Sequence, residues 1–345
     1  MYIGVHVMIF YSIIYTTLRE AAAVTWDLFK IMIPIIIVVK VLQEVGAITW
    51  LAWPLSPVME CVGLPGSMGL VWATAMVNNI YSGIVVYLSL AGDVPLTAAQ
   101  VTVLATMILV AHSLPVELEI VRKSGPKLWF QALLRIGSAF VIGIFLNRIY
   151  GWGGWLQEKS VLLLKPHSGN HDLLSWGIAQ CENLFWIFVI ILGLLVLMKV
   201  LSGLGITKML VCLLNPVLRI LGIGSEAAPL TIVGMVMGLG YGGGLILHEV
   251  KQGRVGRRDI FFALSLMGLA HSVIEDTLLM LSLGGHISGI LVARVGFALL
   301  FVFVLVRITG RMSDNAFFRY FFAPPSPSAA ERMTVMSKHI PFPGK

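Results

Sequence analysis

Charged residues are scarce in this chain, and their scarcity places most of it inside a membrane. Of its 345 residues only 12% are Asp, Glu, Lys or Arg, whereas 58% are hydrophobic. A soluble domain has about 25% charged residues. Apolar runs with the length of a spanning helix, roughly 20 residues, recur along the chain; Leu28–Val45 and Leu184–Leu201 are examples. We therefore predict an all-α, polytopic helical membrane protein that contacts the lipid bilayer.

Several functional motifs are also missing. The cysteines Cys61, Cys181 and Cys212 lack metal-type spacing, and no GxxxxGK[ST] or HExxH motif occurs. We therefore expect no cofactor, no metal and no nucleotide bound by a P-loop. The net charge of +7 comes from bases in short loops and at the C-terminal end, where such charges set membrane orientation, so we expect no nucleic-acid partner. Met1–Thr17 has no basic n-region and no cleavage site, so we expect a retained apolar or interfacial helix.

The most informative feature is an internal repeat. Shifting the sequence by 159 positions aligns Lys40 with Lys199, Pro57 with Pro216, and the triplet Ala111–Ser113 with Ala270–Ser272. Apolar matches are common in a hydrophobic chain, but paired His, Lys and Pro are not. A duplicated half with buried-looking ionisable residues is typical of membrane transporters whose site lies between the repeats.

The loop charges predict that the two repeats have opposite orientations. The loop Ala91–Thr97 has one Asp and no base, whereas its counterpart His248–Arg258 has four bases. One helix later the pattern reverses: bases follow the first copy, and Ser282–Ser288 has none. By the positive-inside rule, the members of each loop pair lie on opposite sides of the membrane. The C-terminus is then cytoplasmic, in a bacterial or archaeal cell membrane.

This organisation divides the chain into five segments. They are an N-terminal apolar or interfacial helix (1–27), a first repeat (28–150), an extracytoplasmic linker (151–183), a second, inverted repeat (184–310) and a cytoplasmic tail (311–345). Each repeat contains a spanning helix, a short Pro-containing amphipathic segment, a broken or re-entrant stretch and two further helices. The number of crossings, three or five per repeat, stays open, and so does the oligomeric state, a homo-oligomer included.

Two histidines with serine and acidic neighbours are candidate binding residues. We expect His112 and His271 midway along helices, His271 sharing a face with Glu275, and Ser272 sharing one with Asp276. The first copy contributes Ser113 and Glu117. Ionisable groups at membrane depth usually face a bundle interior or an aqueous cavity, so these residues predict a central site. A structural network in which they satisfy one another is the alternative.

Two polar or glycine-rich interruptions are further candidates, because unwound backbone in transporters lines substrate and ion sites. The candidate substrate-binding residues here are Asn78, Asn79 and Tyr81 in the first repeat and Gly240, Tyr241 and Gly242 in the second. Close packing through small residues is the competing interpretation for the glycines. Arg135 and Arg294 lie deep in their helices and are expected to pair with Glu117, Glu119, Asp276 or an anionic substrate.

The short segment before each interruption resembles a known family. It reads Leu55-Ser56-Pro57-Val58 up to Gly63, and Leu214-Asn215-Pro216-Val217 up to Gly222. This pattern is similar to the Gate, or nucleoside-recognition, domain of concentrative nucleoside transporters, ferrous-iron transporters and spore maturation membrane proteins. The resemblance covers about Leu28–Gly125 and Leu184–Gly284. It implies paired inverted units with re-entrant segments and a nucleoside-like solute.

These observations favour a secondary transporter, not an enzyme, that moves a small polar or anionic solute with a coupling ion or proton. His271, Glu275 and Asp276 are the expected proton-handling residues, since an unperturbed histidine titrates at about 6.5. The alternatives are a membrane-embedded, metal-dependent enzyme acting on a lipid-linked substrate, for which His271 and Glu275 have compatible spacing, and a non-transporting assembly partner.

Overall fold

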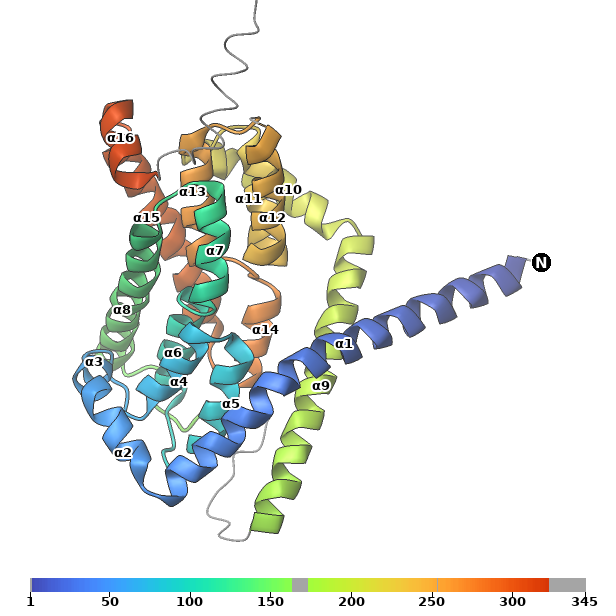
Figure 1. Ribbon diagram of the computed structural model, residues 1–345, viewed down its shortest axis with the longest axis vertical. Helices are drawn as coiled ribbons and strands as arrows, with labels where there is room; N and C mark the ends of the chain where they lie inside the picture. The colour runs from blue at the N-terminus through green and yellow to red at the C-terminus, as the bar shows by residue number, and fades with distance from the viewer. Residues whose placement is uncertain (1, 163–172, 253, 323–345) are drawn as a thin grey trace, which may run out of the picture.

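The computed structural model describes residues 2–162, 173–252 and 254–322, and these residues form helices (Figure 1). Within these ranges β-structure is limited to isolated bridges, Thr97 with Lys159 and Pro126 with Phe322. Five helices are long and apolar enough to cross a bilayer: Tyr15–Glu44, Ala98–Ser124, Leu128–Gly153, Leu173–Gly203 and Ser288–Thr309. The predicted all-α polytopic membrane protein is confirmed.

The helices of the first half begin with α1 and end with α8. They are α1 (Tyr2–Glu44), α2 (Ala47–Ala52), the 3₁₀ turn η1 (Trp53–Leu55), α3 (Ser56–Cys61), α4 (Met68–Val77), α5 (Ile80–Leu90), α6 (Ala98–Val110), α7 (Leu114–Ser124) and α8 (Leu128–Gly153).

The second half follows with nearly the same spacing. It contains α9 (Leu173–Gly203), α10 (Ile206–Ile220), α11 (Ala227–Met237), α12 (Leu239–Gln252), α13 (Arg257–Leu269), α14 (Glu275–Ser282), the π-helical η2 (Ser288–Ala293), α15 (Arg294–Thr309) and α16 (Asp314–Phe321). The one helix α10 stands where the first half has α2, η1 and α3. A second proline explains the difference: Pro54 opens a new turn in the first half, and Leu213 occupies the equivalent position in α10.

The predicted interruptions are turns between short helices that fold back on one another. α4 and α5 have 10 and 11 residues, and α11 and α12 have 11 and 14, too few to span a bilayer separately. Gly83 packs against Ala75, and the equivalent Gly242 packs so closely on Gly234 that a Cβ at 242 would lie 2.8 Å from the Gly234 nitrogen. Each pair is therefore an antiparallel hairpin, closed at Asn78–Asn79 or at Gly238.

Part of the predicted second interruption is wrong. The chain leaves helical geometry at Gly238, whose φ is +98°, but α12 begins again at Leu239 and runs through Gly240, Tyr241 and Gly242. Gly242 therefore serves the close packing of α12 on α11, as the competing interpretation proposes, whereas Gly243 faces Ile120 of α7.

Hydrogen bonds at the two ends of the bundle show the direction of each helix. At one end the start of α6 meets the segment after α8, since Ala98 N donates to Glu158 O over 2.9 Å, and Ser160 Oγ donates to Gly284 O after α14 over 3.3 Å. At the other end the rings of Phe130 in α8 and Phe261 in α13 lie 5.1 Å apart. The chain of α6 and α7 thus runs antiparallel to that of α13 and α14.

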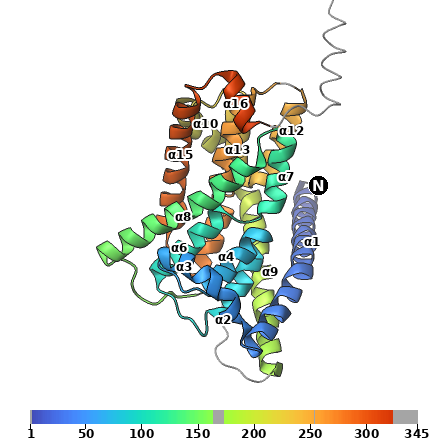
Figure 2. The same cartoon turned by 60° about the vertical axis from the view of Figure 1, so that its left-hand side comes forward.

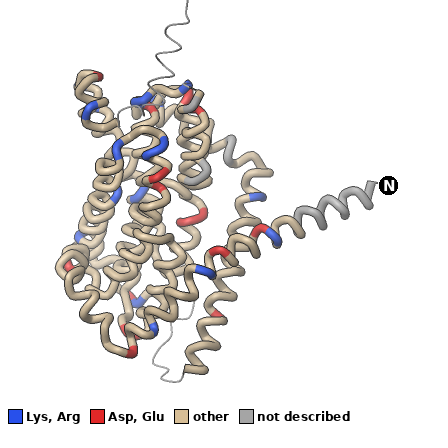
Figure 3. The backbone as a smooth tube through the Cα atoms, viewed as in Figure 1, with Lys and Arg blue, Asp and Glu red and all other residues tan. Residues whose placement is uncertain are grey.

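Charge separates the same two ends (Figure 3). Bases gather at one end of the bundle, at the end of α7, at the start of α13, in α16 and in the loops beside these helices: Arg122, Lys123, Lys127, Arg254, Arg257, Arg258, Arg311 and Arg319. The opposite end has few bases and exposes Trp152 and Trp155. By the positive-inside rule, the end with α7, α13 and α16 is expected on the cytoplasmic side.

The helices α1 and α9 lie side by side at the edge of the bundle (Figures 1 and 2). Lys199 pairs with Glu20 at 2.5 Å and donates to the Thr17 hydroxyl at 3.0 Å, while Lys40 lies 5.9 Å from the Trp176 ring centre. Residues 17 and 176, like 40 and 199, are separated by the repeat distance, so these contacts are counterparts. The predicted boundary between 27 and 28 falls inside α1, and the proposed separate N-terminal helix is part of it.

The ends of two other predicted segments also change. The linker predicted at 151–183 is shorter, because α8 continues to Gly153 and α9 starts at Leu173; residues 163–172 lie outside the described part. The predicted tail begins with a packed helix, α16, whose Phe317 is buried 5.3 Å from the Phe261 ring. Residues 323–345 of the predicted tail are outside the described ranges.

The orientation is testable with single cysteines in a chain whose own three cysteines are replaced by serine. We expect Trp152→Cys to react with a membrane-impermeant maleimide added to intact cells. Lys123→Cys, at the basic end, should react only after permeabilisation. Labelling of both from the same side would contradict the assignment of the two ends.

Candidate functional site

The candidate site lies where two helices of the bundle are interrupted. α6 ends at Val110 and α7 begins at Leu114, which leaves His112 in the break; α13 ends at Leu269 and α14 begins at Glu275, which leaves His271 in the other. The prediction that both histidines sit inside continuous helices is therefore wrong. The shared helical faces predicted for His271 with Glu275 and for Ser272 with Asp276 are wrong for the same reason.

Each break contains a serine in the left-handed backbone region. Ser113 has φ +51° and Ser272 has φ +45°. This conformation costs an L-residue roughly 1–2 kcal/mol, so the surrounding contacts must hold it. Ser113 N itself donates to Ala75 O at 3.0 Å, and Val273 N, just after Ser272, donates to Met235 O at 2.8 Å. Each break is thereby bonded to the hairpin of its own half.

Two buried arginines donate hydrogen bonds to the backbone carbonyl groups that the helix breaks leave free. Arg135 Nε donates to Val110 O at 2.9 Å and its Nη2 donates to His112 O at 2.9 Å. Arg294 Nε donates to Leu269 O at 3.1 Å and its Nη2 to His271 O at 2.7 Å. A helix end inside a membrane leaves carbonyl groups that lipid cannot satisfy, and guanidinium supplies several donors in one plane. This capping role was not predicted from the sequence, because it depends on where the helices break.

The carboxylates opposite these arginines differ between the halves. Glu117 forms a buried ion pair with Arg135 through Oε2 and Nη1. Asp276 occupies the equivalent position and is one methylene shorter. Its Oδ2 and the Arg294 Nη1 are buried, and neither has a hydrogen-bond partner within the described ranges. Among the described residues, Asp276 Oδ2 and Arg294 Nη1 of the second half are therefore unpaired, whereas the equivalent groups of the first half form the Glu117–Arg135 ion pair.

The two histidines face each other across the crossing. Their Nε2 atoms are 3.2 Å apart and their ring centres 4.9 Å apart. Each Nδ1 lies on the carbonyl four residues earlier: His112 at 3.0 Å from Ile108 O, and His271 at 2.8 Å from Met267 O. A carbonyl only accepts, so we assign the proton of each neutral ring to Nδ1. Each Nε2 then presents a lone pair to the other ring.

The Glu117 carboxylate lies next to both histidine rings. Its Oε1 lies 3.2 Å from His271 Nε2 and 3.9 Å from His112 Nε2. All three residues are buried, with side chains at most 10% exposed. His112, His271 and Glu117 thus place three electron-pair donors around one point, an arrangement that could hold a metal ion. The metal-compatible pair expected from the sequence, His271 with Glu275, is not the one that converges here.

Glu275 lies instead against the first hairpin. The Tyr81 hydroxyl of α5 lies near the Glu275 carboxyl of α14, so the two halves meet here as well. Val116, at the position equivalent to Glu275, is 66% exposed. Glu119 also lies away from the histidines, in an exposed ion pair with Arg122.

The other predicted binding residues divide into capping residues and backbone positions. Asn79 is the N-cap of α5: its Oδ1 accepts from Ser82 N at 2.9 Å, and Asn78 Nδ2 donates to Ser82 Oγ at 2.8 Å. Such a cap stabilises a helix by about 1 kcal/mol, which gives both amides a local role. Gly238 packs on Ser272, where a Cβ would lie 2.8 Å from Oγ. The side-chain surroundings of Gly240 and Tyr241 lie outside the described structure.

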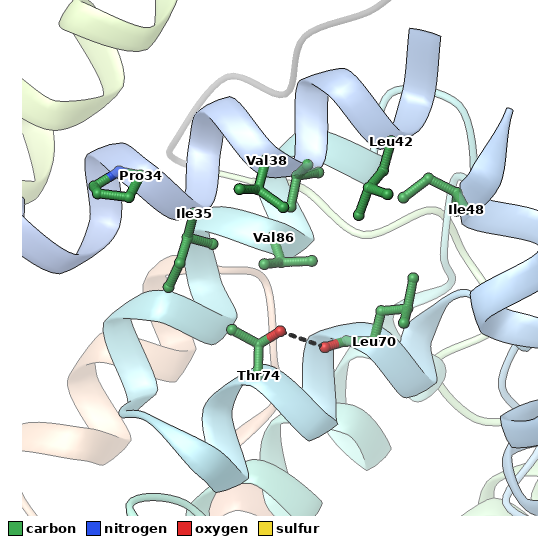
Figure 4. Close-up of a pocket in the computed structure, with 9 residues that line it drawn as sticks. Pro34, Ile35, Val38, Leu42, Ile48, Leu70, Thr74 and Val86 are labelled. Atoms are coloured by element: carbon green, nitrogen blue, oxygen red, sulfur yellow. Dashed lines mark hydrogen bonds between the residues drawn. The ribbon is translucent and has the colours of Figure 1, made fainter. Parts of the chain in front are cut away.

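A separate pocket lies between α1, α2 and the first hairpin (Figure 4). Its lining is apolar, with residues such as Ile35, Val38 and Leu70, apart from Thr74. The Thr74 hydroxyl donates to Leu70 O at 2.7 Å. This pocket suits lipid chains better than a polar solute.

The asymmetry between the two arginines is testable by thermal unfolding in detergent. Arg135→Gln leaves the buried Glu117 carboxylate without its partner, which should cost roughly 3–5 kcal/mol. Arg294→Gln breaks no ion pair and should lower the melting temperature less. The double variant Arg135→Gln with Glu117→Gln should recover part of the loss. Equal melting shifts for the two single variants, with no recovery in the double, would contradict the described pairing.

Comparisons with known proteins support the assignment as a membrane protein but do not indicate an activity. The chain is 28% identical over 299 residues, 85% of its own length and 93% of the relative, to the uncharacterized membrane protein YvoD of Bacillus subtilis (strain 168). No protein-family model matches the chain. No solved structure matches it. The resemblance to the Gate domain therefore stays a prediction.

Proposed function

We propose that this protein is a secondary transporter built from two inverted repeats, which moves a small polar or anionic solute across a bacterial or archaeal cell membrane. Transport is coupled to the gradient of an ion. The basic end of the bundle, with the C-terminus, faces the cytoplasm. In this proposal the protein binds and releases its solute unchanged and is not an enzyme.

The observation that supports the proposal most is the crossing of two interrupted helices. One comes from each half, the two run antiparallel, and His112 and His271 meet with 3.2 Å between their Nε2 atoms. Transporters with inverted repeats place substrate and ion sites at such breaks near the middle of the membrane. Ionisable groups at that depth are costly, so a cluster of them favours a functional role over a purely structural one.

The recurrence of helix bounds supports two equivalent units. α6 spans Ala98–Val110 and α13 spans Arg257–Leu269, which is the same helix shifted by 159 positions. With the hairpins as re-entrant segments, each unit crosses the membrane three times: α1, α6 with α7, and α8 in the first; α9, α13 with α14, and η2 with α15 in the second. An odd number of crossings inverts the second unit relative to the first.

The burial of the cluster is compatible with an occluded state. His112 and His271 are 6% and 2% exposed, so the site is closed to both sides in this conformation. Alternating access requires such a state between the inward- and outward-open ones. The hairpins contact the breaks through Ser113 N and Val273 N, so rocking one unit on the other would change access to the histidines without unfolding a helix.

The chemistry of the crossing favours an anionic or polar solute. Arg294 Nη1 has no hydrogen-bond partner among the described residues, and Tyr81 with Glu275 adds a hydroxyl and a carboxyl at another contact between the two halves. The resemblance to Gate domains adds a nucleoside-like solute to this class.

A membrane-embedded, metal-dependent enzyme is the second candidate. The convergence of His112, Glu117 and His271 is the observation that favours it, since two histidines and a carboxylate are also a common ligand set of catalytic zinc. An enzyme would convert a lipid-linked substrate without moving a solute, so a transport assay separates the two candidates.

The proposal is tested by counterflow in proteoliposomes with labelled uridine, succinate and inorganic phosphate as probes. We expect wild-type protein to exchange at least one of them, and His112→Ala and His271→Ala to lose at least about 90% of the rate, because each removes one wall of the site. His248→Ala is the matched control, since His248 is exposed and lies outside the cluster. Folded wild-type protein that exchanges none of the three probes, or variants as active as His248→Ala, would contradict the proposal.

A further inference from the structure

The crossing brings three electron-pair donors close together. With both Nδ1 protons bound to the carbonyls of Ile108 and Met267, the two Nε2 atoms carry lone pairs 3.2 Å apart. Glu117 Oε1, another electron-pair donor, lies 3.2 Å from one of them. Three electron-pair donors that face one another repel unless a proton or a metal ion lies among them.

The geometry matches a metal ion. The distances among the three donor atoms are 3.2, 3.2 and 3.9 Å, and a point equidistant from all three lies about 2.0 Å from each. Zinc binds histidine nitrogen at about 2.0–2.1 Å and carboxylate oxygen at about 2.0–2.2 Å. An ion could therefore bind with little movement of the ligands.

The groups behind the ligands are those of a metal site. A metal-bound histidine usually donates its other N–H to a carbonyl or carboxylate, and both histidines here do so to a carbonyl. Arg135 holds the Oε2 of Glu117, which leaves Oε1 as a single ligand atom. These contacts fix the ring orientation and the free carboxylate oxygen before an ion arrives.

The donor set selects the class of ion. Two imidazole nitrogens and one carboxylate oxygen suit zinc and its first-row neighbours, whereas calcium and magnesium need six or more oxygen ligands. Asp276 interacts electrostatically with His271 and Glu117, and its buried Oδ2 lacks a hydrogen-bond partner among the described residues, but it is not one of the three side chains whose ligand atoms converge.

We propose that His112 Nε2, His271 Nε2 and Glu117 Oε1 bind one divalent transition-metal ion, of which Zn²⁺ is the best fit, at the crossing of the two halves. Metal binding at this site does not depend on the proposed transport, because it can be measured on the purified protein without a solute. Since each half supplies one histidine, the bound ion joins the two broken helices and stabilises the crossing. The guanidinium groups of Arg135 and Arg294 oppose the ion's charge, so its affinity should be lower than that of a structural zinc site.

The test uses full-length protein purified in detergent through a tag without histidine, stripped with a chelator and titrated with Co²⁺ and Zn²⁺. We expect one Co²⁺ per chain with the visible absorption of a four-coordinate site, displaced by Zn²⁺ but not by excess Mg²⁺ or Ca²⁺. His271→Ala and His112→Ala should each weaken binding at least about tenfold. The double variant His248→Ala with His286→Ala, which removes two exposed histidines outside the site, should bind like the wild type.

A variant that fails to fold would be recognised by its melting curve, and Glu117→Gln then provides a milder change. It keeps the side-chain length and an oxygen that can accept from Arg135 but removes the charge, so we expect weaker Zn²⁺ binding with a folded protein. Equal binding by the wild type and the His112 and His271 variants would overturn the proposal, as would no binding by folded wild type. A protein that binds zinc here but exchanges no solute would keep this inference and contradict the proposed transport.

Discussion

The structure depends on one constraint, the need of every backbone polar group in a bilayer for a partner within the protein. A helix that breaks at membrane depth exposes carbonyl groups there, and lipid offers them no donor. Arg135 and Arg294 meet this need, each donating to two carbonyls at the end of a broken helix. Their charge is tolerated so deep because it is bound to backbone and, for Arg135, to Glu117. The breaks, and hence the positions of both histidines, require these two side chains.

Once the breaks are fixed, the crossing follows from the antiparallel arrangement of the two halves. His112 and His271, which are 159 positions apart in the chain, meet there with their Nε2 atoms 3.2 Å apart. The two halves differ in the carboxylates that lie beside the two arginines. Glu117 reaches its arginine, whereas the shorter Asp276 has a buried oxygen without a partner.

The repeat made much of this predictable. Paired polar residues at a constant spacing indicated two units, and the alternation of basic loops indicated opposite directions; the described helices have the matching bounds and run antiparallel. The hairpin turns at Asn78–Asn79 and Gly238 were also visible as polar or glycine interruptions. The breaks at His112 and His271 were missed because Ala, His and Ser continue an apolar helical pattern. Pro115 at the start of α7 was a sequence signal for the first break, whereas the left-handed serines and the arginine caps that end both helices appear only in the structure.

The sequence by itself determined the class of protein, the pairing of its halves and the set of ionisable residues at membrane depth. These follow from composition and spacing, because hydrophobicity decides what enters a bilayer and a duplicated pattern folds into duplicated units. The tertiary structure decided which of those residues meet. His112, His271 and Glu117 come from two helices far apart in the chain, while Glu275, four residues after His271, turns to Tyr81 instead. Spacing along a chain predicts which side chains are neighbours only where the helix is continuous. In this protein the ionisable residues of the candidate site lie at or beside helix breaks.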